Sequence, residues 1–166
     1  MKSKELIYIV IAIVIVSGGI ITINRFIDRF YIGDNRKSIY TDNSKIVALN
    51  DNYSYLYKRG INEKGYTNIS FKFSGMETIW EISSKKDSTI NIEFDSKIES
   101  GKFKVVLIDP NDNVIKILEQ SQEGRSKFNI EKGNSRIKII GSDCKGKLKI
   151  NITTNKEDDI GVVDIY

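Results

Sequence analysis

Hydrophobic residues follow two different patterns along this chain. Residues 6–23, LIYIVIAIVIVSGGIITI, contain no charged residue and no proline, and twelve of these eighteen positions are Leu, Ile or Val. A helix of this length measures roughly 27 Å, close to the ~30 Å hydrocarbon core of a bilayer. Beyond residue 65, apolar and polar residues alternate, which is typical of strands with one buried face. The pattern predicts an N-terminal transmembrane α-helix followed by an all-β domain.

Eight runs with period two account for the all-β prediction. Turn-forming residues such as Ser74-Gly75, Ser100-Gly101 and Asp143 to Gly146 separate them, at the spacing typical of a sandwich. Because each run has one apolar side, we expect about eight strands in two facing antiparallel sheets, a β-sandwich. The apolar positions are Ile69, Phe71 and Phe73; Trp80 and Ile82; Ile90, Ile92 and Phe94; Phe103, Val105 and Leu107; Ile115 and Ile117; Phe128 and Ile130; Ile137 and Ile139; and Leu148, Ile150 and Ile152.

The two patterns divide the chain into segments. Around the β domain, Ile46 to Leu49 and Tyr53 to Tyr57 are candidate short strands, and the end of the chain either adds an edge strand or frays. The predicted segments are a cytoplasmic tail (1–5), a transmembrane helix (6–23), a juxtamembrane segment (24–37), a linker or edge strands (38–65), the β-sandwich domain (66–154) and an acidic tail (155–166).

The N-terminal run also has the features of a signal peptide. Lys2 and Lys4 precede it, and Ser17 and Gly19 stand at a plausible cleavage spacing, so cleavage stays an alternative. We favour an uncleaved anchor because the apolar run resumes at Ile20. Long domains cross the membrane largely regardless of charge, so we expect a single-pass protein of the cell membrane with its C-terminal domain outside.

Two stretches resemble known families. Glu5 to Ile13, a glutamate before an apolar helix, resembles the start of a mature type IV pilin, which would imply an envelope-assembly subunit. Lys132 to Ile139, then Gly141 and Lys147 to Ile150, resemble the closing hairpin of small secreted jelly-roll domains, including the pre-peptidase C-terminal type. This second resemblance implies a jelly-roll-like sandwich with an accessory, non-catalytic role.

Composition removes most catalytic chemistry. The chain has no histidine, so the usual serine and cysteine hydrolase arrangements are excluded, and its single cysteine, Cys144, cannot form an internal disulfide. Asp109, Asn111 and Asn113 match only the first half of a calcium loop. We therefore predict no catalytic residue, no cofactor and no metal site. The carboxylates that remain for glycosidic chemistry are expected to face solvent: Glu77, Glu81, Glu93, Asp95 and Glu99.

Charge and aromatic residues supply the candidate binding surfaces. Beyond residue 33 the chain has 22 Lys and Arg against 20 Asp and Glu, interleaved, so no nucleic-acid partner is expected. Alternation predicts an outward row of lysines suited to an anionic envelope polymer and an exposed tyrosine row suited to a sugar or protein. These candidates are Lys102, Lys104, Lys138, Lys147, Lys149, Tyr53, Tyr55 and Tyr57. The resulting hypothesis is a membrane-anchored, non-catalytic module that binds a protein partner or a cell-envelope component.

Overall fold

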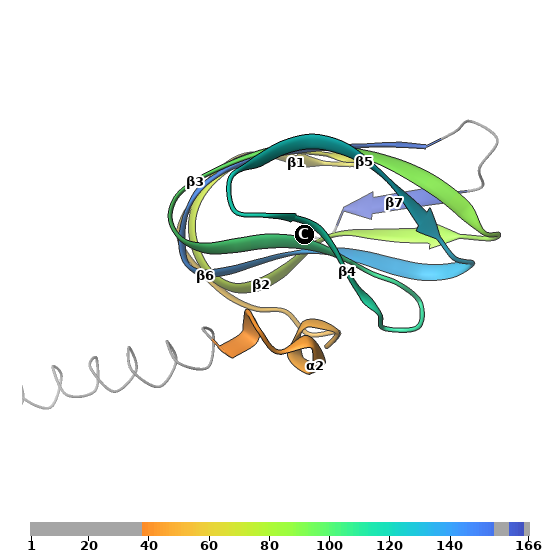
Figure 1. Cartoon of the computed structure of the whole chain (residues 1–166), viewed down its shortest axis with the longest axis horizontal. Helices are drawn as coiled ribbons and strands as arrows, with labels where there is room; N and C mark the ends of the chain where they lie inside the picture. The colour runs from red at the N-terminus through yellow and green to blue at the C-terminus, as the bar shows by residue number, and fades with distance from the viewer. Residues whose placement is uncertain (1–37, 155–159, 165–166) are drawn as a thin grey trace, which may run out of the picture. The chain divides into compact units, whose positions relative to one another are not determined.

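A computed structural model describes residues 38–154 and 160–164, all of which belong to one compact unit, Arg36–Tyr166 (Figure 1). Every strand pairing in this part is antiparallel, which confirms the all-β antiparallel prediction. The described part holds seven strands, fewer than the eight runs. The elements are α2 (Asn43–Ile46), β1 (Asn52–Glu63), β2 (Tyr66–Ser84), β3 (Ser88–Ile108), β4 (Val114–Glu119), β5 (Gln122–Ile130), β6 (Gly133–Thr154) and β7 (Ile160–Asp164).

Three long strands pass through both layers of the sandwich. β6 lies in the middle and pairs along its length with β2 on one side and β3 on the other. The first layer is completed by β1 beside β2 and by β5 beside β3, whereas the second layer is completed by β7 beside β2 and by β4 beside β3. Figure 1 shows the long strands curving from one layer into the other at the left of the view.

Glycines permit these bends. Gly75 in β2 and Gly101 in β3 have φ values of +109° and +78°, a region that other residues rarely adopt. A Cβ at Gly75 would lie 2.0 Å from the carbonyl oxygen of Asn52, and one at Gly101 would lie 2.3 Å from that of Asp143. The strand register shifts at the same places, as expected where an irregular residue bends a strand.

Three of the turns predicted from the sequence are wrong, because the chain bends at these positions instead of reversing. Ser74-Gly75, Ser100-Gly101 and Asp143 to Gly146 are not turns, because each lies inside a continuous strand. Six of the eight predicted runs are therefore halves of β2, β3 and β6. Likewise, the predicted closing hairpin is not a hairpin. Its two halves are the two ends of β6, which crosses from layer to layer instead of reversing.

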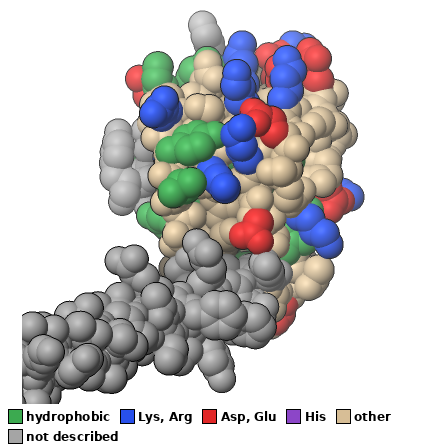
Figure 2. All heavy atoms as spheres, turned by 90° about the vertical axis from the view of Figure 1, so that its left-hand side faces the viewer, with side chains coloured by type: hydrophobic (Ala, Val, Ile, Leu, Met, Phe, Trp, Pro, Cys, Tyr) green, Lys and Arg blue, Asp and Glu red, His purple; other side chains and the backbone are tan. Residues whose placement is uncertain are grey.

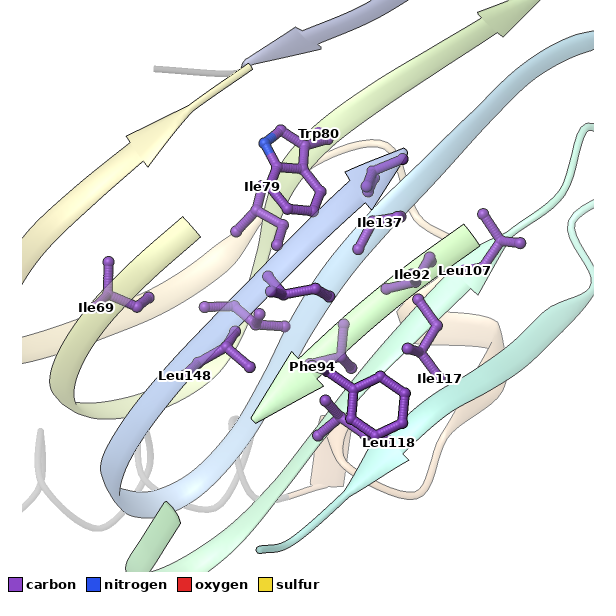
Figure 3. Packing of buried hydrophobic residues seen from close by; sticks show 14 of the residues in the cluster. Ile69, Ile79, Trp80, Ile92, Phe94, Leu107, Ile117, Leu118, Ile137 and Leu148 are labelled. Carbon is purple, nitrogen blue, oxygen red and sulfur yellow. The ribbon is translucent and has the colours of Figure 1, made fainter. Parts of the chain in front are cut away.

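The main core fills the space between the layers. Most of the apolar positions predicted from alternation are buried there, including Phe71 of the first layer and Leu107 of the second, but Phe128 is only half-buried. The prediction is wrong for Ile115, which is 37% exposed on the edge strand β4. Trp80 is fully buried, and its indole Nε1 donates a hydrogen bond to the carbonyl oxygen of Glu63 at 3.1 Å. Figure 3 shows Phe94 of the first layer and Leu118 of the second among these side chains. Burial of this kind contributes roughly 1.5–3 kcal/mol per large side chain.

A second apolar cluster lies on the outer side of the second layer. Residues 38–51, here called the covering segment, place Ile39 and Ile46 against outward side chains of the sheet such as Met76 and Ile140. The predicted strand at Ile46 to Leu49 is wrong. The helix α2, which Asp42 caps by accepting a hydrogen bond at Oδ1 from the Ser44 backbone N–H at 3.0 Å, ends at Ile46, and residues 47–49 form no strand.

The two ends of the chain differ in what the structure describes. Near the C-terminus, Ile160–Asp164 pairs with β2 as strand β7, which settles the open choice in favour of an edge strand. At the N-terminus, the predicted transmembrane helix, its flanking segments and the pilin-like stretch all lie outside the described residues. Among the residues that are described, no helix has the length and hydrophobicity to cross a bilayer.

Candidate functional site

The outer side of the first layer carries the candidate site. We call it the open face: the outward residues of β1, β2, β6, β3 and β5. Strand pairing aligns them in rows, because directly opposed residues point to the same side of a sheet. One row joins Tyr66, Asn151, Glu93 and Arg125. These residues alternate with buried core residues, so the face is polar while its underside is apolar.

One hollow of about 470 Å³ opens over this first row, and we call it the β5-side hollow. Tyr66 and Asn151 line one side of it, and Glu93 and Arg125, which form an ion pair, line the other. The next row adds Lys149, Asp95 and Glu123 to the lining. The hollow therefore combines a half-buried aromatic ring with amide, carboxylate and cationic groups, and its three carboxylates and two cations leave a formal charge of −1.

A second hollow of about 390 Å³ lies toward β1, and we call it the β1-side hollow. Arg59 of β1 pairs with Ser70 of β2, and Ser70 pairs with Lys147 of β6, so the three residues form one row. Asn68 and the exposed Ile61 line it as well. This hollow has two cations and no carboxylate in its lining.

The two hollows adjoin each other. Asn68 lines the β1-side hollow and Lys149 lines the β5-side hollow, and these two residues are direct partners across β2 and β6. One elongated ligand can therefore extend across both hollows and contact all five strands of the first layer.

The five predicted lysines do not form one patch. Lys147 and Lys149 lie on the open face, both exposed. Lys102 and Lys104 lie on the outer side of the other layer, where their Nζ atoms are 5.9 and 4.9 Å from the centre of the Tyr40 ring. Lys104 is half-buried, and desolvation lowers its pKa despite the attraction of a nearby carboxylate. Figure 2 looks onto the bend of the long strands and shows lysine and arginine side chains gathered over its upper part.

Lys138 is the clearest departure from the predicted patch. Its side chain is 0% exposed because the covering segment lies over it, so it takes no part in an exposed surface. Its Nζ donates hydrogen bonds to the Ala48 carbonyl oxygen at 2.6 Å and to Asp51 Oδ1 at 3.2 Å. Alternation was right that Lys138 points outward from the core, but the outward side of this layer is buried.

The predicted tyrosine row is also divided. A bulge between Tyr55 and Tyr57 adds one residue and turns them to opposite sides of β1. Tyr55 stacks on Phe73 with ring centres 4.9 Å apart, and its hydroxyl donates to Glu77, so burial and that carboxylate raise its pKa. Tyr57 lies on the open face with the Arg59 guanidinium 5.9 Å from its ring centre, while Tyr53 is 45% exposed beside Tyr55.

The thiol of Cys144 and the carboxylate of Asp109, two groups with the chemistry for catalysis or metal binding, are buried or hydrogen-bonded within the domain. Cys144 is buried in the core, and this burial raises the pKa of its thiol to about 12, which suppresses the thiolate. Burial alone would raise the pKa of Asp109, but hydrogen bonds from Asn113 and Asn111 lower it below its ordinary value. Across the described ranges, no group of three or more Cys, Asp or Glu residues is arranged to hold a metal ion.

Comparison with known proteins gives only distant likenesses. No family model matches the sequence, and no curated protein matches it. Among solved structures, a CBM35 from Paenibacillus barcinonensis has 14% identity and a TM-score of 0.34, covering 62% of this chain and 93% of that one. A family 35 carbohydrate binding module from Clostridium thermocellum has 11% identity and a TM-score of 0.37, covering 63% and 92%. Likenesses this weak carry over neither a ligand nor an activity.

Proposed function

We propose that this chain is a non-catalytic binding module that binds a polar polymer of the cell envelope on its open face. The observation that carries the proposal is the pair of adjoining hollows over five paired strands. The backbone of paired strands is fixed before a ligand arrives, so no backbone conformational entropy is lost there on binding. A surface of this kind suits recognition of a long ligand rather than enclosure of a small substrate.

The β5-side hollow has the chemistry for a hydroxylated ligand. A hydroxyl group both donates and accepts hydrogen bonds. Glu93 can accept from it, Arg125 can donate to it, and the Asn151 amide can do both, while the Tyr66 ring offers an apolar surface. Glu93 is paired with Arg125, and Asp95 Oδ2 lies 3.7 Å from Lys97 Nζ. Carboxylates held by cations in this way are suited to orienting a ligand.

The proposal includes the location of the module. The apolar run at residues 6–23 is its support: we propose that this run anchors the chain in the cell membrane and that the domain lies outside, where envelope polymers are accessible. The domain would then act by holding such a polymer, or a partner that carries one, close to the membrane.

The test measures binding of the full-length chain, in a mild non-ionic detergent, to a panel of soluble envelope polysaccharides. We expect Tyr66→Ala to weaken binding about tenfold or more, as loss of a buried aromatic contact does at other interfaces. Tyr53→Ala is the matched control, because it removes a partly exposed tyrosine outside both hollows. Binding of no polymer by the wild-type chain, or equal binding by wild type and Tyr66→Ala, would contradict the proposal.

A further inference from the structure

We propose that the ligand of the open face is acidic, and that the β1-side hollow holds its anionic group between Arg59 and Lys147. This inference rests on the proposed function and narrows it to polymers in which a carboxylate or a phosphate accompanies neutral hydroxylated units. Both anions present oxygen atoms to cationic donors, so the recognition chemistry is the same for either.

The first support is the row that joins Arg59, Ser70 and Lys147. Neighbouring strands are about 4.8 Å apart, so the Cα atoms of Arg59 and Lys147 are separated by roughly 10 Å with Ser70 between them. Both side chains are long and both residues are exposed. An anion seated over Ser70 is therefore within reach of both cations at once.

The second support is that these two cations have no carboxylate partner. Across residues 38–154 and 160–164, neither Arg59 nor Lys147 forms an ion pair. Three other cations of the same face are paired, namely Lys97 with Asp95, Arg125 with Glu93 and Lys145 with Glu99, whereas Lys72, Lys127 and Lys149 form no ion pair among the described residues. The positive charge of the β1-side hollow is thus not neutralised within its own lining, unlike that of the β5-side hollow, where three carboxylates accompany two cations.

The third support is the set of donors around that position. Arg59 has a planar guanidinium that can donate two parallel hydrogen bonds to one carboxylate or phosphate. The Ser70 hydroxyl and the Asn68 side-chain amide line the same hollow and add neutral donors. The guanidinium lies 5.9 Å from the centre of the Tyr57 ring, a cation–π contact that helps to fix its position.

The adjoining hollow defines the rest of the ligand. From Lys147 to Asn151 along β6 is a distance of roughly 13 Å, so one oligomer can reach from the β1-side hollow to the β5-side hollow. The β5-side hollow has a formal charge of −1, which disfavours a second anion there. The two hollows together favour a ligand with an acidic unit beside a neutral hydroxylated one, rather than a uniformly charged polyanion.

The experiment compares matched ligands on the full-length chain in a mild non-ionic detergent. The probes are an oligosaccharide of alternating glucuronate and N-acetylglucosamine, its carboxyl-reduced form, a glycerol phosphate oligomer and glycerophosphoglycerol. The variants are Arg59→Gln/Lys147→Gln and, as the control, Lys97→Gln/Lys145→Gln, which removes the same charge from paired lysines of the same face. Unchanged urea midpoints, followed by Trp80 fluorescence, establish that each variant is folded.

We expect one acidic oligomer to bind at least tenfold tighter than a neutral one, and the Arg59/Lys147 variant alone to lose this advantage. Preference for the glucuronate or the glycerol phosphate oligomer identifies the source of the anion. Equal binding of the acidic and carboxyl-reduced forms, unchanged in the variant and with no preference for the phosphate oligomer, would overturn the inference and leave the proposed function standing. Failure of every oligomer and envelope polysaccharide to bind would overturn both. Binding of glycerophosphoglycerol alone would also overturn it, in favour of a lipid surface.

Discussion

The contact between the covering segment and the sheet depends on one buried charge pair. The Lys138 side chain is fully buried and that of Asp51 is 20% exposed, with 3.2 Å between Nζ and Oδ1. Asp51 also accepts hydrogen bonds from the Thr78 backbone N–H at 2.7 Å and from the Thr78 hydroxyl at 2.9 Å. The perturbation that tests this contact is Asp51→Ala, which leaves the ammonium of Lys138 buried with only the Ala48 carbonyl oxygen as an acceptor.

The expected cost follows from the burial of the pair. Removing one partner of a buried ion pair costs about 3–5 kcal/mol. Because Asp51 is partly exposed, water can replace some of what it provides, so we expect a loss of about 3 kcal/mol. The double variant Asp51→Ala/Lys138→Met should recover part of this loss, since it removes the unpaired ammonium but still leaves the two Thr78 donors without Asp51 as their acceptor. The double variant is therefore predicted to be more stable than the single one.

Urea unfolding of the full-length chain at pH 7 measures these differences. Trp80 is the only tryptophan and is fully buried, so its fluorescence reports unfolding of the sandwich. The control is Asp112→Ala. The Asp112 side chain is 64% exposed and its carboxylate lies 3.0 Å from Arg136, so its removal should cost under about 1 kcal/mol. A loss below 1 kcal/mol for Asp51→Ala, or a double variant less stable than the single one, would refute the reasoning.

The pH dependence gives a second measurement of the same effect. Desolvation lowers the pKa of Lys138 below its ordinary value of 10.5, although Asp51 opposes the shift. Without Asp51 the folded-state pKa falls further. Between that value and 10.5 the unfolded chain binds more protons than the folded one, so stability rises with pH. The deficit of Asp51→Ala relative to wild type should therefore shrink between pH 7 and pH 10.

Four further variants are tested by the same urea assay. Gly101→Ala should cost at least about 2 kcal/mol, because its φ is +78° and the Cβ would meet a carbonyl oxygen, whereas Gly161→Ala, with nothing within 4 Å, should stay within about 0.5 kcal/mol. Ser135→Ala should raise stability by about 1 kcal/mol, because this buried hydroxyl has no hydrogen-bond partner among the described residues; a loss would contradict this. Cys144→Ala should weaken the decline of stability at alkaline pH. Burial raises the pKa of this thiol from its ordinary value of 9.0 to about 12, so it lowers wild-type stability above pH 9 by up to about 1.4 kcal/mol per pH unit. An unchanged decline in the variant would contradict this.

Alternation predicted which residues form the inner face of the sandwich, and it did so because burial of one face leaves a direct trace in the sequence. It could not show that two successive runs belong to one strand. A glycine between two alternating runs is equally consistent with a reversal and with a bend, as at Gly75 and Gly101. The choice is made by pairing with β6, whose residues lie far away in the sequence.

The sequence does contain an indication that the second layer is covered, although the alternation of apolar and polar residues does not reveal it. Residues 105–108, Val-Val-Leu-Ile, are all buried, and Ile140 follows the inward Ile139 without a polar residue between them. A continuous apolar run in a strand indicates that both of its faces are covered. The continuous apolar run therefore indicates that a further segment covers the outer side of the second layer. The same cover explains why Lys138, which points to that side, is buried rather than exposed.

The open face could be predicted only in part. Lys147, Lys149, Glu93 and Asp95 were expected to point outward, and they do. Their neighbours were not predictable, because the row of Arg59, Ser70 and Lys147 joins three strands. Its register depends on a bulge in β1 and on bends in β2 and β6. A shift of one residue in any of these strands would turn its side chains to the other face of the sheet, and the three residues would no longer lie side by side.

The two outer faces of the sandwich differ in what they can bind, and the outward residues of the same long strands cause the difference. In the second layer these are apolar, such as Met76 and Ile140, and they bind the chain's own covering segment. In the first layer the continuations of β2 and β6 present Ser70, Lys147 and Lys149 instead, which gain little from burial under an apolar segment. Residues 38–51 therefore pack against the second layer, and the polar outer face of the first layer remains uncovered by them and available for a ligand.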